Sequence, residues 1–493
     1  MSQPPLHSTF DSIAALAGAV GRGDVDPTVL ADDAMRHAQA GNGPGLFADL
    51  DAEAGNRETS DAALAGVPIG IEDRLVTRRW RSTGGSRMLA AYQSPFDATA
   101  VQDLEQAGCL TVGKLACAEF SMDSASEFAL FEATPNPWDA QRQGGSGAAA
   151  AVARRLVMGA VGVDTGGSLR AGAALCGVSA LRPGQGMVSR LGVIAAASSM
   201  DQVTPVARGA GDLAALLDPI CHFDPQDATS LEHLNGEANR IGRVRESWQT
   251  HRMAQQAQGS RPLKNLRIGI LEGDGDGLSA AVADSMEAAL QTLESLGAQR
   301  VAIALSADGQ AATAYHLIAA AEAASNLSRY DGVHFGFRAG RYDDVHDMIG
   351  RSRAQGFGQA IIERILLGTR VMSHGHYEAL CLPAQRVRRL LAQSLRQALS
   401  QSCDLVLRPA LPDTAPLLDA QTSLAVRWAR DRYLAAASLT GLPALCFPGA
   451  PDPDGLPIGM QLIGPDLAEG WLLAVAECFQ DVTQWHQREP EQH

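Results

Sequence analysis

Lysine is scarce in this chain: its 493 residues include only Lys114 and Lys264. Acidic residues outnumber basic ones, and the formal net charge is −15 at pH 7. Such an acidic chain lacks the broad basic surface that attracts a phosphate backbone. We therefore expect no direct binding of nucleic acid. The scarcity of lysine also leaves few candidates for a lysine general base.

Several other features are missing. No long uncharged apolar run could span a bilayer, and Met1 to Asp11 has neither the basic nor the apolar part of a signal peptide. The eight cysteines show no paired spacing, which is typical of reduced thiols. The nucleotide-binding patterns GxGxxG and GxxxxGK[ST] are absent, and His374 and His376 lack neighbouring ligands at metal-site spacing. We expect a cytoplasmic protein with no cofactor, no metal and no membrane contact.

Two serines that each follow a Gly-Gly pair are the first positive signal. Ser146 lies in GGS, and Ser168 lies in DTGGS after the apolar run Leu156–Val163, which predicts a buried strand or helix. A Gly-rich loop at the end of such an element can present a nucleophile on a rigid base. Ordinary turns also favour Gly and Ser, and for GGS that interpretation is equally good.

A serine nucleophile needs a base to take its proton. No histidine lies near either serine in the sequence, so a serine–lysine arrangement is the alternative. Lys114 follows an apolar run, and burial there would lower its pKa towards neutrality. A purely structural role for Lys114 remains open at this point.

The pattern of apolar residues predicts an α/β protein. Strands at Leu266–Leu271 and Val301–Leu305 flank an amphipathic helix at Leu278–Leu296, and Ser12 to Ala40 has helical spacing. Strand and helix patterns also alternate from Gly66 to Val206.

The chain divides into an N-terminal helical segment at 1–60 and a larger domain at 61–493. Within that domain, residues 221–262 are polar and predict a surface insertion. Residues 311–399 are largely helical in pattern.

Five segments in order resemble the amidase signature family of serine hydrolases. They are Gly66–Asp73 (GVPIGIED), Asn136–Asp139 (NPWD), Gly162–Arg170 (GVDTGGSLR), Cys176–Pro183 (CGVSALRP) and Gly455–Gly464 (GLPIGMQLIG). The resemblance implies a single mixed β-sheet flanked by helices on both faces, the amidase signature fold.

Further segments resemble one branch of that family, the A subunits of glutamyl-tRNA(Gln) amidotransferases. They include Ser94–Thr99, Glu119–Met122, Ser325–Leu327, Arg329–Gly332 and Gly356–Gly358. Members of this branch hydrolyse glutamine and send ammonia to a partner subunit, which binds the tRNA and amidates Glu-tRNA(Gln). The resemblance therefore implies glutamine or another small amide as substrate, and a tRNA-binding partner subunit. The alternatives are a stand-alone amidase and a catalytically inactive binding subunit.

The family mechanism can be carried over by position. Ser168 would attack the amide carbonyl, and the backbone N–H groups of Thr165, Gly166, Gly167 and Ser168 would form the oxyanion hole. A second serine, after a cis peptide bond, would relay the proton to a lysine. The relay position falls on Ser146 when the Gly-Gly-Ser runs are aligned, and on Gly144 when residues are counted back from Ser168 without a gap.

The position of the family's base lysine holds Glu72. A carboxylate is a much weaker base than a neutral lysine. The catalytic set implied by the resemblance is thus Ser168, Ser146 and Glu72, with an altered proton path.

The substrate-binding residues of the branch fall on Tyr315, Arg364 and Asp431. The planar fork of an arginine suits a carboxylate, and an aspartate suits an ammonium group. We expect the nearby Arg427, Arg430 and Arg432 to form a charged helix face. We expect Asp164 and Arg170 to brace the nucleophile loop, and Asp201 and Gln202 to support it from behind.

Overall fold

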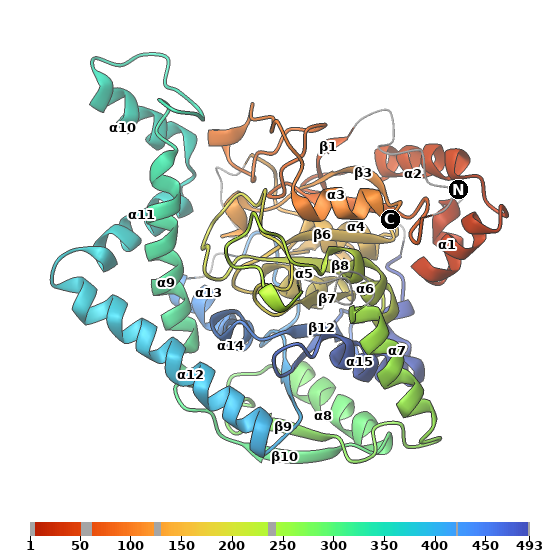
Figure 1. The fold of residues 1–493 in the computed structure, drawn as a ribbon. Helices are drawn as coiled ribbons and strands as arrows, with labels where there is room; N and C mark the ends of the chain where they lie inside the picture. Colours follow the sequence, from red (N-terminus) through yellow and green to blue (C-terminus); the bar gives the residue numbers. More distant parts are fainter. Residues whose placement is uncertain (1–4, 51–61, 123–129, 235–242, 421–422, 492–493) are drawn as a thin grey trace.

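A large mixed β-sheet runs through the centre of the molecule (Figure 1). The computed structural model describes residues 5–50, 62–122, 130–234, 243–420 and 423–491. The sheet has eleven strands in these residues. From edge to edge they are β1 (Phe47–Leu50), β3 (Leu110–Leu115), β2 (Pro68–Glu72), β6 (Gly159–Asp164), β8 (Gln202–Ala207), β7 (Ser179–Arg182), β12 (Ala444–Pro448), β13 (Gly459–Ile463), β11 (Leu405–Pro409), β9 (Arg267–Leu271) and β10 (Gln299–Ile303). A separate hairpin pairs β4 (Pro135–Asn136) with β5 (Asp139–Gln143).

The strand directions confirm the predicted mixed sheet. Strand β2 pairs in parallel with β3 and β6, and β9 pairs in parallel with β10 and β11. The strands from β6 through β8, β7, β12 and β13 to β11 pair antiparallel. The parallel arrangement of β2 and β6 matters for the site, because it brings Glu72 and Asp164, their last residues, to the same edge of the sheet.

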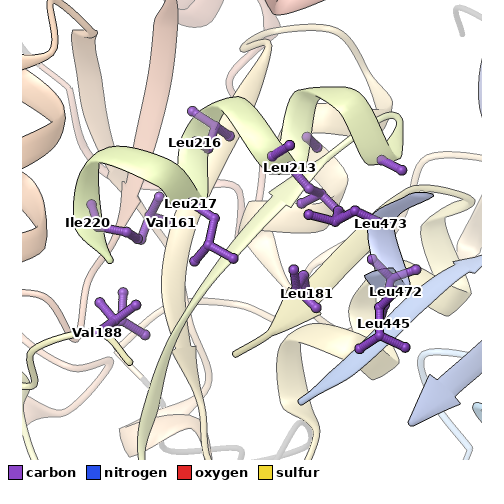
Figure 2. Packing of buried hydrophobic residues seen from close by; sticks show 14 of the residues in the cluster. Val161, Leu181, Val188, Leu213, Leu216, Leu217, Ile220, Leu445, Leu472 and Leu473 are labelled. Carbon is purple, nitrogen blue, oxygen red and sulfur yellow. The ribbon is translucent and has the colours of Figure 1, made fainter. Parts of the chain in front are cut away.

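Successive side chains of a strand point to opposite faces, and each face of the sheet is buried by its own helices. One face packs on α6 (Ala210–Leu217) and α15 (Glu469–Thr483), where Leu213, Leu216, Leu472 and Leu473 meet Val161, Leu181 and Leu445 from the strands (Figure 2). On the other face, Ala160, Ala180 and Cys446 pack with α4 (Gly147–Ala153) and α5 (Ser168–Cys176). Each fully buried leucine contributes roughly 1.5–3 kcal/mol to folding.

The N-terminal segment contributes helices and one strand. Helices α1 (Ile13–Gly21) and α2 (Pro27–Gly41) are separate because Asp26 caps a new helix by accepting from the backbone N–H groups of Thr28 and Val29. Strand β1 then joins the sheet antiparallel to β3. These residues therefore share the sheet of the rest of the chain.

The largely helical section forms an arm beside the sheet (Figure 1). It comprises α9 (Ala311–Asn326), α10 (Val345–Gly356), α11 (Gln359–Met372), the π-helical turn Tyr377–Cys381 and α12 (Leu382–Gln401). Helix α11 packs along α9. Helices α13 (Leu424–Arg430) and α14 (Arg432–Thr440) follow and bring the chain back to the core.

The remaining helices lie at the periphery. They are α3 (Thr99–Gln106), α7 (Arg243–Gln256) and α8 (Ala280–Ser295), together with short 3₁₀ turns. Helix α7 belongs to the polar segment 221–262 and lies against α15, where Arg252 forms ion pairs of 2.9 Å with Glu477 and 2.7 Å with Asp481. Among the helices of the described residues, none combines the length and apolarity that crossing a bilayer requires.

Candidate active site

One cavity of about 210 Å³ gathers side chains from distant parts of the sequence. Eight of the residues expected in the site line it: Glu72, Ser146, Gly166, Gly167, Ser168, Tyr315, Arg364 and Asp431. Thr165 does not line this cavity, since its buried hydroxyl donates to Asp201 at 2.5 Å. The strand edge, the arm and the α13–α14 junction together form the walls.

Ser168 is the first residue of α5, directly after the turn that leaves β6. The turn passes through Gly167 with a φ of 122°, a backbone conformation that only glycine adopts readily. The first N–H groups of a helix have no partner within it, and they carry the positive end of the helix dipole. The Ser168 hydroxyl therefore stands where backbone donors can stabilise an oxyanion.

Buried ion pairs brace the nucleophile loop, as expected. Asp164 accepts from Arg170 at 3.0 and 3.1 Å, and Arg182 donates to the Asp164 carbonyl at 2.6 Å. Burial alone would raise the pKa of Asp164, but the two guanidinium groups outweigh it and hold that pKa below its usual value. The Asp164 carboxylate is therefore a structural anchor.

A second buried network holds the other side of the loop. Arg74 donates to Asp201 at 2.8 Å and to the Thr165 hydroxyl at 3.0 Å. It also donates to the Ile194 carbonyl at 3.0 and 3.1 Å. This network fixes Thr165 in the turn before Ser168 and explains why its side chain faces away from the cavity.

Glu72, which the resemblance sets at the position of the family's base lysine, ends β2 and is buried beside the last residues of β6. One carboxylate oxygen accepts from the Ser121 hydroxyl at 2.8 Å, and the other accepts from the backbone N–H of Val163. Burial raises the pKa of Glu72, and the charge of Arg74 opposes that rise. Both carboxylate oxygens are thus engaged inside the wall of the cavity.

Lys114 does not line the cavity. It lies on β3, is fully buried, and donates to the Leu75 carbonyl and to the Ser82 hydroxyl, the latter at 3.0 Å. Burial lowers the pKa of Lys114 to about 8, although the charge of Asp73 raises it. The pKa of Lys114 is lowered in the expected direction, and its hydrogen bonds away from the cavity favour the structural role.

Ser146 precedes α4 and lines the cavity. The cis peptide bond that the resemblance implies before the relay serine is a wrong expectation, since no peptide bond within the described residues is cis. Gly145 instead turns the chain with a φ of 74°. The side-chain hydrogen bond that Glu72 receives comes from Ser121.

Tyr315 and Arg364 reach the cavity from the arm. Tyr315 on α9 lies so close to the nucleophile loop that a Cβ on Gly166 would stand 2.1 Å from its hydroxyl. Burial raises the pKa of Tyr315 to about 12, so the hydroxyl stays protonated and can donate. Arg364 on α11 donates to the Met122 carbonyl at 3.2 Å, which leaves other N–H groups for a ligand.

His316 is a cavity residue that the sequence reasoning missed. Its Nε2 lies 3.0 Å from the Asp431 carboxylate, and its ring stacks on Trp428 with centroids 4.3 Å apart. Its position next to Tyr315 is the only sequence signal that could have singled it out. The helical pattern alone does not tell which side of α9 faces a ligand.

Two of the three arginines expected on a charged helix face lie at the cavity. Arg427 and Arg430 are half-buried and line it, a position that the sequence did not predict. The fold turns α13 towards the cavity, and burial lowers the pKa of Arg430. Arg432 points elsewhere and donates to the Gly273 and Asp276 carbonyls at 3.2 and 3.1 Å. The cavity therefore has guanidinium groups on more than one wall.

The fold and this constellation of a serine at a helix start define an amidase-type hydrolase. The family model described as Amidase matches residues 47–473. The chain belongs to the amidase family.

Comparison with individual proteins is more specific than the family model. The chain is 48% identical over 505 residues to a protein from Bordetella avium named as the A subunit of glutamyl-tRNA(Gln) amidotransferase, and the match covers 99% of each chain. The crystal structure of the protein of that name from Thermotoga maritima superposes with a TM-score of 0.76 at 29% identity, over 94% of each chain. A peptide amidase from Stenotrophomonas maltophilia has the same fold, with a TM-score of 0.79 at 24% identity over 99% of each chain.

Proposed function

We propose that this chain is the glutaminase component of an amidotransferase, which hydrolyses glutamine and supplies ammonia to a partner subunit. The observation that carries the proposal is the single cavity at Ser168, which Tyr315, Arg364 and Asp431 also line. These residues come from four separate helices or helix ends. The named relatives that match almost the whole chain support the same assignment.

In this proposal each group has one task. Arg364 binds the α-carboxylate of glutamine through its planar fork, and Asp431 binds the α-ammonium group. Ser168 attacks the side-chain carboxamide. The backbone N–H groups of Gly166, Gly167 and Ser168 stabilise the oxyanion, where one donor is worth roughly 3–4 kcal/mol.

The partner subunit completes the function. In the proposed complex the partner binds the tRNA, which agrees with the net charge of −15 on this chain. The complex would act in the cytoplasm on glutamine and Glu-tRNA(Gln).

Ammonia release from glutamine tests the proposal. The full chain is purified with any co-purifying subunit, and ammonia is measured for the wild type and for Ser168→Ala. A fluorophosphonate probe is applied in parallel. We expect ammonia release and a probe adduct on Ser168 in the wild type, both lost in the variant. A wild type with neither property would overturn the proposal.

A catalytically inactive binding subunit is the second candidate. The specific observation in its favour is Glu72, whose oxygens both accept hydrogen bonds. The sequence resemblance sets this residue where the family has a lysine. Glutamine binding measured by calorimetry, without ammonia release, would favour this candidate.

A further inference from the structure

Glu72 and Ser168 bind the same residue of β6. The Val163 N–H donates to Glu72, and the Ser168 hydroxyl donates to the Val163 carbonyl at 3.4 Å. In an extended strand the N–H and C=O of one residue point to the same neighbour. The carboxylate and the nucleophile therefore lie on the same edge of β6.

The backbone of β6 leaves room for this carboxylate. A Cβ on Gly162 would stand 2.2 Å from a Glu72 oxygen, so any larger residue there would displace the side chain. Glu72 is buried, and so is the strand end it touches. Its carboxylate is therefore held by the strand and by one hydroxyl, that of Ser121.

Ser121 is held in a strained conformation that aims its hydroxyl at Glu72. Phe120 and Ser121 have φ angles of 50° and 54°, in the left-handed region that non-glycine residues rarely adopt. Such strain persists only where the surroundings enforce it, and it concentrates at functional sites.

The surroundings that enforce this conformation are on both sides of the turn. Glu119 accepts from the Ser86 hydroxyl at 2.6 Å and from the Gly358 N–H, at the start of α11, at 3.0 Å. The Phe120 ring packs on Tyr330 and Phe357, with centroids 5.7 and 6.1 Å apart. The turn is thereby fixed to the base of the arm.

Ser121 also faces the substrate side. It lines the same cavity as Ser146 and Ser168, and it is only partly buried. A hydroxyl that both touches the cavity and donates to a buried carboxylate can accept a proton from one side and pass its own to the other. Ser146 lines the cavity as well, but the hydrogen bond to Glu72 comes from Ser121.

We propose that Ser121 is a further catalytic residue, which passes the Ser168 proton to Glu72 in place of the serine–lysine relay of the family. This assignment rests on the proposed function. As the Ser168 oxygen bonds to the carboxamide carbon, its proton moves to the Ser121 oxygen and the Ser121 proton moves to Glu72. The carbonyl π electrons move to the oxygen in the oxyanion hole.

Collapse of the tetrahedral intermediate restores the carbonyl and breaks the C–N bond. The leaving nitrogen takes the proton back from Glu72 through Ser121 and departs as ammonia. Water then cleaves the acyl-serine by the same path, and the enzyme ends with the protons it began with.

The charged and titratable neighbours of Glu72 set its basicity. Asp73 and Arg74 directly follow Glu72 in the chain. Lys114 on β3 and Cys117, just after β3, also interact with its charge. Burial raises the pKa of Glu72, which brings this carboxylate closer to the basicity that proton abstraction near neutral pH requires.

Ser121→Gly is the decisive variant, because glycine readily adopts the left-handed backbone while the side chain that carries the hydroxyl is removed. The full chain with any co-purifying subunit is compared as wild type, Ser121→Gly, Ser146→Ala, Glu72→Gln and the double variant that combines Ser121→Gly with Glu72→Gln. The exposed Ser400→Ala serves as the matched control. Glutamine hydrolysis is measured as kcat and KM over pH 5–9, and circular dichroism confirms folding.

We expect Ser121→Gly to lower kcat by about 100-fold or more with KM changed less than threefold, because general-base transfer is typically worth 10²–10⁴-fold. Glu72→Gln should lower kcat by a similar factor. In this variant kcat/KM should no longer fall as the pH is lowered, because the group that titrates there is gone. Combining both changes should add little, since residues of one relay act as a unit. Ser146→Ala should lower kcat by less than tenfold.

Some results would overturn the proposed proton relay and leave the proposed function intact. If Ser121→Gly keeps wild-type kcat while Ser146→Ala abolishes turnover, Ser146 is the relay and the proposed function stands. If folded Ser121→Gly and Glu72→Gln each lower kcat and their effects multiply, the two residues do not form one relay. A wild type that neither releases ammonia nor reacts with the fluorophosphonate overturns both proposals.

Discussion

Asp164→Asn removes the charge that holds the nucleophile loop and keeps the shape of the side chain. In the folded protein Asp164 and Arg170 are both completely buried and form a two-point ion pair of 3.0 and 3.1 Å. The variant leaves the Arg170 guanidinium in the core without its counter-charge. Breaking a buried pair in this way costs about 3–5 kcal/mol, a large part of the roughly 5–15 kcal/mol that stabilises a typical domain.

Urea unfolding followed by circular dichroism measures the loss, and Asp404→Asn is the matched control. Asp404 pairs with Arg267 at 2.7 Å on the surface, with both side chains partly exposed, so its loss should cost less than about 1 kcal/mol. Fluorophosphonate labelling of Ser168 should slow in Asp164→Asn and stay normal in the control. Equal, small losses in both variants would refute the reasoning that the buried pair braces the loop.

The pH dependence of stability follows from the same pair. The Asp164 pKa is depressed in the folded state, so its contribution is fully present above the unfolded pKa near 3.9. It is lost as the pH falls through the lower folded value. The stability difference between wild type and Asp164→Asn should therefore be constant from pH 5 to 8 and shrink only below about pH 4.

Three further predictions concern the cavity and its wall. Gly166→Ala would place a Cβ 2.1 Å from the Tyr315 hydroxyl and should lower kcat/KM for glutamine at least tenfold. The control Gly275→Ala, which has open space around the new Cβ, should change kcat/KM less than twofold. Arg364→Met should raise KM for glutamine about 10- to 100-fold, as expected for the loss of a charged hydrogen bond, and an unchanged KM would remove Arg364 from the substrate site. Lys114→Met should keep glutamine hydrolysis. Because the Lys114 pKa is lowered to about 8, the wild type should gain up to about 3 kcal/mol of stability relative to the variant as pH rises from 8 to 10.5.

The strands and the nucleophile loop can be predicted from local pattern. The apolar run 266–271 becomes β9 (Arg267–Leu271), and the run that ends at Val163 becomes β6 (Gly159–Asp164). Short apolar runs of this length are a local signal that predicts these strands. The Gly-Gly-Ser turn after β6 likewise follows from local conformational freedom, which is why the sequence predicts Ser168 as the nucleophile.

Element boundaries depend on partners that a local pattern does not contain. The helical spacing from Ser12 to Ala40 is divided into two helices, because Asp26 caps the second one. The predicted strand Val301–Leu305 is shifted to Gln299–Ile303, since β10 takes its register from parallel pairing with β9. Hydrogen bonding to a neighbour therefore decides what periodicity leaves open.

The order of residues along the chain is enough to predict the α/β sheet and the position of Ser168, and the family resemblance adds the expectation that Glu72 stands in place of a base lysine. The contacts of Glu72 depend on the folded molecule, because Ser121 and Val163 are brought to it by the parallel pairing of β2 and β6 and by a strained turn. Folding also buries Lys114 in the core and turns Arg427 and Arg430 towards the cavity. Proton transfer and substrate binding depend on distances of a few ångströms between residues far apart in the chain, and those distances are set by packing.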